Sequence, residues 1–169
     1  MAAHKLIESL SNGNKQEYAG KTTSAGAGDS GEFPVLDGSG KLDSSFMPAG
    51  IGADTITADA GENLAAGDFV YFDSSGDVFK ADASAIAKAA VGYVLDAVTS
   101  GQPATVYFDD ANTSVTGLTV GSKYYLSGST PGAITTTAPT TSGHIVQSVG
   151  VPHLATSLHV RLSEPVIRA

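Results

Sequence analysis

The residues of this 169-residue chain that could perform chemistry are glycines, aspartates, serines and four histidines. Residues 26–31 read Gly-Ala-Gly-Asp-Ser-Gly, the glycine spacing of a dinucleotide-binding turn. That turn must follow an apolar strand and open a helix, whereas no apolar strand precedes it here and Pro34 follows. Gly40 and Lys41 lack the earlier glycine and the following hydroxyl residue of a phosphate-binding loop. The sequence therefore predicts no nucleotide cofactor.

A cation-binding loop is conceivable from Asp37 to Asp43, because alternate oxygen-bearing side chains suit a hard cation. The glycine required at the sixth position and the glutamate required at the twelfth are both missing, and Pro48 stands at the latter. We therefore interpret residues 37–43 as a tight turn.

The spacing of the histidines along the sequence is not that of a metal site. They are His4, His144, His153 and His159. His153 and His159 could approach each other across a hairpin, but no third ligand stands at the close spacing that metal sites usually show. Cysteine is absent, which excludes thiolate nucleophiles and disulfides. We expect no metal and no other cofactor.

The remaining polar residues show no pattern that is typical of a catalytic site. Serines are abundant, but no Gly-x-Ser-x-Gly elbow occurs, and the fragment around Ser39 lies in a glycine-rich segment with no rigid scaffold. Asp109–Asp110, like Asp73 and Asp77, are interpreted as solvated turn residues. Paired glycosidase carboxylates stay open on spacing alone, yet the chain has no Trp and only 7% aromatic residues. We expect no catalytic residue and no enzyme.

Charge and composition exclude further classes of function. The net charge of −8 repels phosphate backbones, so nucleic acid is not an expected partner. No run of basic residues would attract an anionic membrane, no stretch approaches the roughly 20 apolar residues of a membrane span, and the first twenty residues lack the apolar centre of a signal peptide. We expect synthesis in the cytoplasm.

The elements that must position these residues are short strands separated by turn-forming clusters. We predict strands at 54–58, 68–73, 77–81, 90–97, 103–109, 113–117, 123–127, 132–137, 144–151 and 157–163. Residues 73–76 and 127–132 are predicted as hairpin turns in equivalent places. Only 83–90 has the alanine content of a short helix. The predicted fold class is all-β, a small β-barrel or β-sandwich.

An internal duplication organises this β region, residues 54–169. Leu64-x-x-Gly67-x-x-Val-Tyr-Phe matches Leu118-x-x-Gly121-x-x-Tyr-Tyr-Leu at an offset of 54, and similar matches follow, so the repeats span about 64–110 and 118–164. Each copy is too small to bury its apolar face alone. We therefore expect the two copies to complete one another.

Residues 1–53 form a different region, predicted as an extended N-terminal arm. Leu6, Ile7 and Leu10 could share one face of a short helix, and from Gly13 onward the apolar content is too low for a separate core. The arm could fold back on its own domain or lie along another protein. The predicted interaction residues are its apolar anchors: Leu6, Ile7, Leu10, Phe33, Val35, Leu36, Leu42, Phe46, Met47 and Pro48.

The run LDGSGKLDSSFMPAGIGADTITA, with ENLAAGDFVYF and VGYVLDAVTSGQPATVYF, resembles the capsid decoration, or cement, proteins of tailed bacteriophages. The second copy, GLTVGSKYYLSGSTPGAITTTAPTTSGHIVQSVGV, resembles a module of phage tail fibres and other virion structural proteins. The resemblance covers the chain from about residue 35. It implies a small β-domain on the outer capsid surface of the virion, forming a homotrimer, with an arm that bridges subunits of the major capsid protein.

The sequence therefore predicts a non-catalytic virion protein that stabilises an assembled shell. A tail-fibre or receptor-binding component is the alternative that the second copy suggests, although six Tyr and no Trp offer little for glycan binding. A bacterial adhesion module is a third hypothesis, which the missing signal peptide disfavours.

Overall fold

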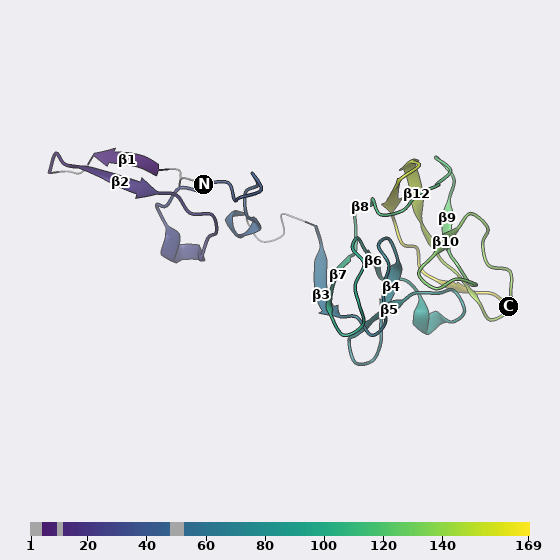
Figure 1. Cartoon of the computed structure of the whole chain (residues 1–169). Coiled ribbons are helices and arrows are strands. Elements are labelled where there is room, and N and C mark those ends of the chain that lie inside the picture. The colour runs from purple at the N-terminus through teal and green to yellow at the C-terminus, as the bar shows by residue number, and fades with distance from the viewer. Residues whose placement is uncertain (1–4, 10–11, 48–52) are drawn as a thin grey trace. The chain divides into compact units, whose positions relative to one another are not determined.

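A computed structural model describes residues 5–9, 12–47 and 53–169 of the chain (Figure 1). The chain divides into two compact units, residues 1–52 and residues 53–169. Regular structure in the described residues consists of short antiparallel strands and three single turns of 3-10 helix. The fold class is all-β, as predicted. The described residues contain no helix long and apolar enough to cross a membrane.

The second unit begins with a five-stranded antiparallel sheet, which together with its loops we call the first module (residues 53–110). Its strands are β3 (Thr55–Asp59), β4 (Phe69–Phe72), β5 (Val78–Lys80), β6 (Gly92–Val94) and β7 (Pro103–Tyr107), in the order β3-β7-β6-β4-β5. The predicted turn at 73–76 joins β4 to β5, because the Asp73 carboxylate accepts the N–H groups of Ser75 and Asp77 at 2.8 and 3.0 Å.

The second module (residues 111–169) contains another five-stranded antiparallel sheet. Its strands are β8 (Ala111–Asn112), β9 (Tyr124–Leu126), β10 (Ile134–Thr135), β12 (Ser148–Leu154) and β13 (Ser157–Val160), in the order β10-β9-β12-β13-β8. A separate pair is formed by β11 (Ile145–Val146) and β14 (Val166–Ile167). The predicted turn at 127–132 joins β9 to β10.

The two sheets share one topology, which strand by strand reads β5-β4-β6-β7-β3 and β10-β9-β12-β13-β8. Their registers also agree: Val70 lies opposite Gly92 in the first sheet, and Tyr124 lies opposite Gly150 in the second. Gly67 and Gly121 both adopt positive φ, 88° and 77°. The pairing of β12 with β13 differs by two residues from that of β6 with β7. The repeat includes β3 and β8, and so begins earlier than its sequence match.

Two apolar clusters stabilise the second unit. One lies within the first module and contains Val70, Val78, Val94 and Val106, on one face of the first sheet. The other is shared by the modules, because Phe69 and Tyr93 on the opposite face pack in one cluster with second-module residues such as Leu126. The sheets thus form a sandwich in which the first sheet is covered on both faces.

A buried polar contact also joins the modules. The Gln147 side chain accepts the Ala90 N–H at 2.8 Å and donates to the Ala90 carbonyl at 2.8 Å. Both residues are buried, Gln147 with 3% and Ala90 with 4% exposed surface. Because buried polar groups require partners, this pairing fixes the distance between the two modules at that point.

The structure corrects three local predictions. The helix predicted around Leu6 and Ile7 is wrong, because residues 5–9 form β1 (Lys5–Ser9), an antiparallel partner of β2 (Lys15–Ala19). The helix at 83–90 is reduced to one 3-10 turn, Ile86–Lys88. The strand predicted at 113–117 is wrong, since β8 ends at Asn112, where the side-chain oxygen accepts the N–H of Ser114.

Candidate functional site

The first unit carries the predicted apolar anchors, and none of residues 7 and 12–47, whose exposure is described, is buried. Its described segments are joined by the β1–β2 hairpin and by an isolated parallel bridge between Lys21 and Pro34. Its two 3-10 turns are Gly26–Asp29 and Ser44–Phe46. This unit is therefore held by backbone hydrogen bonds and small contacts, without a core.

Two of the anchors contact their own unit. Phe33 and Val35 lie so close to Gly20 that a Cβ atom there would collide with both side chains. The ring of Phe33 also lies 5.9 Å from that of Tyr18, centroid to centroid. These two anchors are half-buried and fix the path of the chain where the hairpin meets residues 33–35.

Other anchors are exposed to solvent. The exposed fractions are 72% for Ile7, 57% for Leu36, 38% for Leu42 and 43% for Met47. Phe46 is half-buried within its 3-10 turn. Leu6 lies opposite Tyr18 in the β1–β2 pair. Leu10 and Pro48 lie outside the described residues.

The tight turn predicted at 37–43 is present and sets the spacing between Leu36 and Leu42. One carboxylate oxygen of Asp37 accepts the N–H groups of Ser39 and Lys41 at 2.8 and 2.9 Å. Asp43 then caps the next 3-10 turn by accepting the Ser45 N–H at 2.9 Å, and hydrogen bonds from Ser45 lower the pKa of the Asp43 carboxyl. Both aspartates thus act as turn residues.

The glycine-rich segment at 26–31 is also a local turn. The Lys21 ammonium lies 3.0 Å from the Asp29 carboxylate, whose second oxygen accepts the Ala25 N–H at 2.5 Å. The hydrogen bond from the Ala25 backbone, followed by that from Lys21, lowers the pKa of the Asp29 carboxyl. The strand before it, β2, is polar and largely exposed, and the described residues 32–43 after it contain no helix. The turn therefore lacks the structural context of a dinucleotide site.

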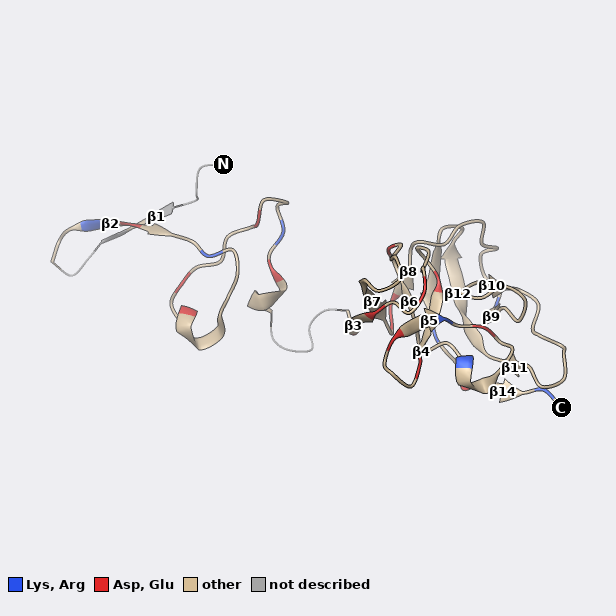
Figure 2. Ribbon diagram, turned by 60° about the horizontal axis from the view of Figure 1, so that its bottom comes forward, with Lys and Arg blue, Asp and Glu red and all other residues tan. Residues whose placement is uncertain are grey.

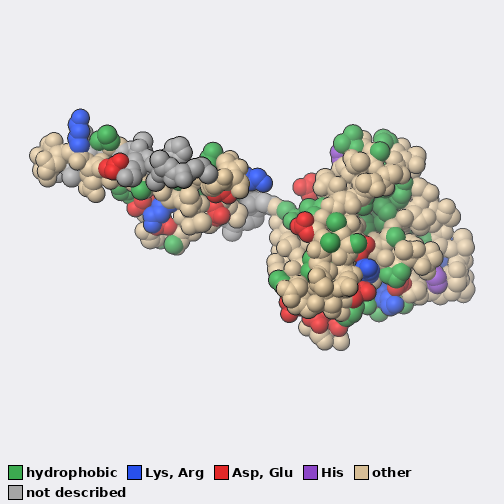
Figure 3. All heavy atoms as spheres, in the orientation of Figure 1, with side chains coloured by type: hydrophobic (Ala, Val, Ile, Leu, Met, Phe, Trp, Pro, Cys, Tyr) green, Lys and Arg blue, Asp and Glu red, His purple; other side chains and the backbone are tan. Residues whose placement is uncertain are grey.

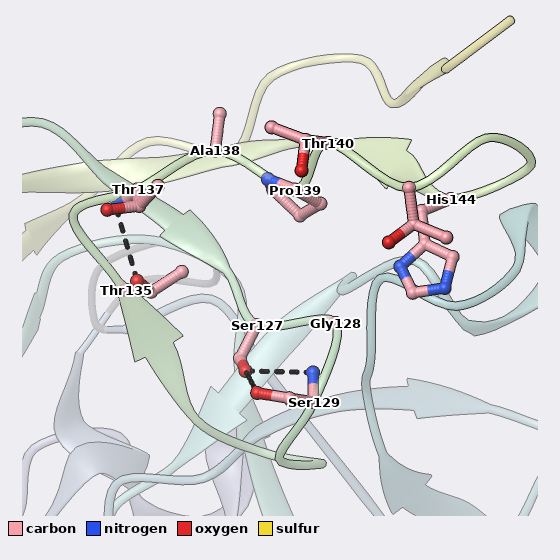
Figure 4. Close-up of a pocket in the computed structure, with 10 residues that line it drawn as sticks. Ser127, Gly128, Ser129, Thr135, Thr137, Ala138, Pro139, Thr140 and His144 are labelled. Carbon is pink, nitrogen blue, oxygen red and sulfur yellow. Dashed lines mark hydrogen bonds between the residues drawn. The ribbon is translucent and has the colours of Figure 1, made fainter.

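A polar hollow of about 300 Å³ in the second module contains His144 (Figure 4). Its serine and threonine hydroxyls serve local turns: the Ser127 hydroxyl accepts the Ser129 N–H at 3.2 Å, and Thr135 accepts the Thr137 N–H at 3.1 Å. No hydrogen bond joins the His144 ring to a serine in the part of the chain that the structure describes. The hollow thus lacks the hydrogen-bonded nucleophile and base of covalent catalysis.

The remaining histidines are dispersed over the second module. His159 lies opposite Val151 across the β12–β13 pair, whereas His153 lies at the irregularity between Pro152 and Leu154. Among residues 5–9, 12–47 and 53–169, no group of three histidine or carboxylate side chains is placed to hold a metal ion.

No protein-family model matches the chain, and no curated protein matches it. The second unit buries its apolar residues within two clusters, and its described buried side chains leave no polar atom without a partner. The first unit presents exposed apolar side chains (Figure 3), and no residue of it whose exposure is described is buried. The anchors of the first unit are therefore the best candidate for a functional surface, one that binds a protein.

Proposed function

We propose that this chain is a decoration, or cement, protein of a tailed-bacteriophage capsid. It binds the outer surface of the assembled shell, as a homotrimer, and its first unit bridges neighbouring subunits of the major capsid protein. One observation carries the proposal: the first unit, in which no residue of described exposure is buried, displays Ile7, Leu36, Leu42 and Met47 to solvent. The family resemblance of the sequence supplies the identity of the partner.

The anchors account for the strength of binding. Burying an apolar side chain of this size contributes about 1.5 to 3 kcal/mol when it is fully covered. Four partly exposed anchors therefore offer only several kcal/mol, before the cost of ordering and of lost translational freedom. A single first unit should bind weakly.

Three copies acting together convert weak binding into firm attachment. When one first unit has bound, the others act at a high local concentration, which can raise the overall affinity by a factor of about 10² to 10⁴. Since the assembled lattice presents all the binding sites at once and free subunits do not, binding stabilises the shell by mass action. The second unit then serves as the platform that holds the copies.

The test is a triple variant, Leu36→Asp, Leu42→Asp and Met47→Asp, mixed with undecorated shells of the phage. We expect it to lose cosedimentation with the shells and to give no protection against heat. Ile86→Asp is the matched control, because Ile86 is similarly exposed, at 48%, but lies in the second unit. Undiminished binding of the triple variant, or equal loss in the control, would refute the role of the first unit.

Deletion of residues 1–52 gives a second test, because the second unit contains both apolar clusters and is expected to fold without the first. The remaining chain should keep its far-ultraviolet circular dichroism and lose shell binding. Binding of the full chain to host cells, with no binding to shells, would contradict the proposal and favour the tail-fibre alternative.

A further inference from the structure

The two modules carry opposite net charges although they share one topology. Residues 53–110 contain ten acidic and two basic residues, a net charge of −8, whereas residues 111–169 contain one acidic and three basic residues, a net charge of +2. Figure 2 shows most of the acidic segments of the second unit around β3 to β7. The duplication accounts for the strand order that the two modules share. It does not account for their opposite net charges, which need a separate explanation.

The basic side chains of the second module gather at a hollow of about 370 Å³. It is lined by Lys123, Ser148, Gly150, Val151, His159 and Arg161. Lys123, Val151, His159 and Arg161 are exposed. At Gly150 the backbone lies so close to the facing strand that a Cβ atom would collide with the His159 carbonyl oxygen. We call this the basic hollow.

The first module has aromatic side chains at the corresponding places. Lys123 occupies the position of Phe69, Val151 that of Tyr93 and Arg161 that of Tyr107. Because the pairing of β12 with β13 is shifted by two residues, His159 is the residue opposite Val151. The rings of Tyr93 and Tyr107 stack at 5.7 Å, and Phe69 and Tyr93 are buried in the shared cluster. This face of the first sheet is therefore buried by aromatic side chains. The corresponding face of the second sheet is exposed to solvent and carries positive charge.

The two cations of the basic hollow, Lys123 and Arg161, form no ion pair within the described chain. The ion pairs there join Lys21 to Asp29, Lys80 to Asp68 and Lys88 to Asp82. No carboxylate of the described residues lies within 4.0 Å of Lys123, His159 or Arg161. The hollow is thus free to bind carboxylates supplied from outside the chain.

An exposed acidic cluster lies beside it, formed by Asp54, Asp109 and Asp110. The Phe108 N–H donates to the Asp54 carbonyl at 3.1 Å, which brings the three aspartates to one end of the β3–β7 pair. Burial, followed by the negative charge of Asp110, raises the pKa of Tyr93 to about 12. The three exposed carboxylates themselves give this end of the pair a negative potential.

We propose that the basic hollow of one copy binds the acidic cluster of a second copy. Charge complementarity supports this occupant, because the first module of every copy carries a surplus of carboxylates. The Val160 N–H donates to the Asp110 carbonyl at 2.9 Å, so the hollow and the cluster lie on adjoining segments. Since every copy carries both, each copy can contribute the hollow to one contact and the cluster to another. This contact would hold together the copies of the proposed homotrimer, but it is argued from the charges and geometry of the second unit alone.

The test is sedimentation velocity of the full chain and of the variant Lys123→Glu with Arg161→Glu. We expect the unmodified chain to self-associate at about 50 mM NaCl and to dissociate at about 500 mM, where screening is strong. The double variant should associate at least about tenfold more weakly, since both partners of each contact are then negative. Arg168→Glu, a cation outside the hollow, is the matched control and should behave like the unmodified chain.

A complementary variant separates a lost contact from a damaged fold. Asp54→Lys with Asp109→Lys should also associate weakly alone, and mixing it with the Lys123→Glu and Arg161→Glu variant should restore association between the two. Unmodified chains that stay monomeric at 50 mM NaCl, or a mixture that shows no restored association, would overturn the proposal. Shell binding is not measured in this assay, so failure of the contact between copies and failure of shell binding are distinguishable.

Discussion

Replacing Gln147 with methionine tests whether the modules are held together by a buried polar contact. Methionine keeps the unbranched shape but removes the two hydrogen bonds, each 2.8 Å long, to the Ala90 N–H and carbonyl. Each buried group left without a partner costs about 1 to 3 kcal/mol, and the greater apolar burial of methionine returns about 1 kcal/mol. We expect a loss of about 3 kcal/mol in the free energy of unfolding.

The assay is urea unfolding followed by circular dichroism, because the chain has no Trp. Gln102→Met is the matched control: Gln102 is exposed, and its side chain bonds only the neighbouring Gly101 carbonyl at 3.3 Å. Hydrogen exchange at Ala90 should rise in the Gln147 variant alone. A change below about 0.5 kcal/mol, the usual range for surface substitutions, would show that the contact does not hold the modules together.

Two further predictions concern the first module. Gly92→Ala places a Cβ atom 2.5 Å from the Tyr107 carbonyl oxygen and should cost about 2 kcal/mol of unfolding free energy; Gly38→Ala, with open space around it, should cost nothing measurable, and equal effects would contradict this reasoning. Because burial raises the pKa of Tyr93 from 10.0 to about 12, the folded chain keeps a proton that the unfolded chain releases. Stability should therefore fall as pH rises from 10 towards 12, and Tyr93→Phe should reduce that fall in urea titrations.

The sequence predicted the β region better than the first unit, because turn chemistry is local. Asp73 marks its hairpin with a carboxylate that binds two nearby N–H groups, a signal readable within five residues. The strand at Lys5–Ser9 depends instead on pairing with Lys15–Ala19, and Leu6 and Ile7 suit a helix or a strand equally well. The pair β11–β14 joins residues about twenty apart, so the sequence did not reveal β14.

Sequence reasoning found the exposed anchors but missed the basic hollow. Leu36, Leu42 and Met47 stand out as apolar residues in a polar segment, and the structure leaves them exposed. Lys123 and Arg161 lie far apart in sequence and meet only because β9, β12 and β13 are neighbours. The available signal was the charge of each copy, −8 and +2, which becomes visible once the duplication is divided at residue 110.

The shared cluster is accompanied by a closed set of backbone hydrogen bonds. Phe69 donates to Gly132 at 2.9 Å, Gly132 to Ala81 at 2.8 Å, and Ala81 to Phe69 at 2.8 Å. During synthesis, Gly132 leaves the ribosome long after Phe69 and Ala81. Until then, the Phe69 N–H and the Ala81 carbonyl of the nascent first module stay exposed to water.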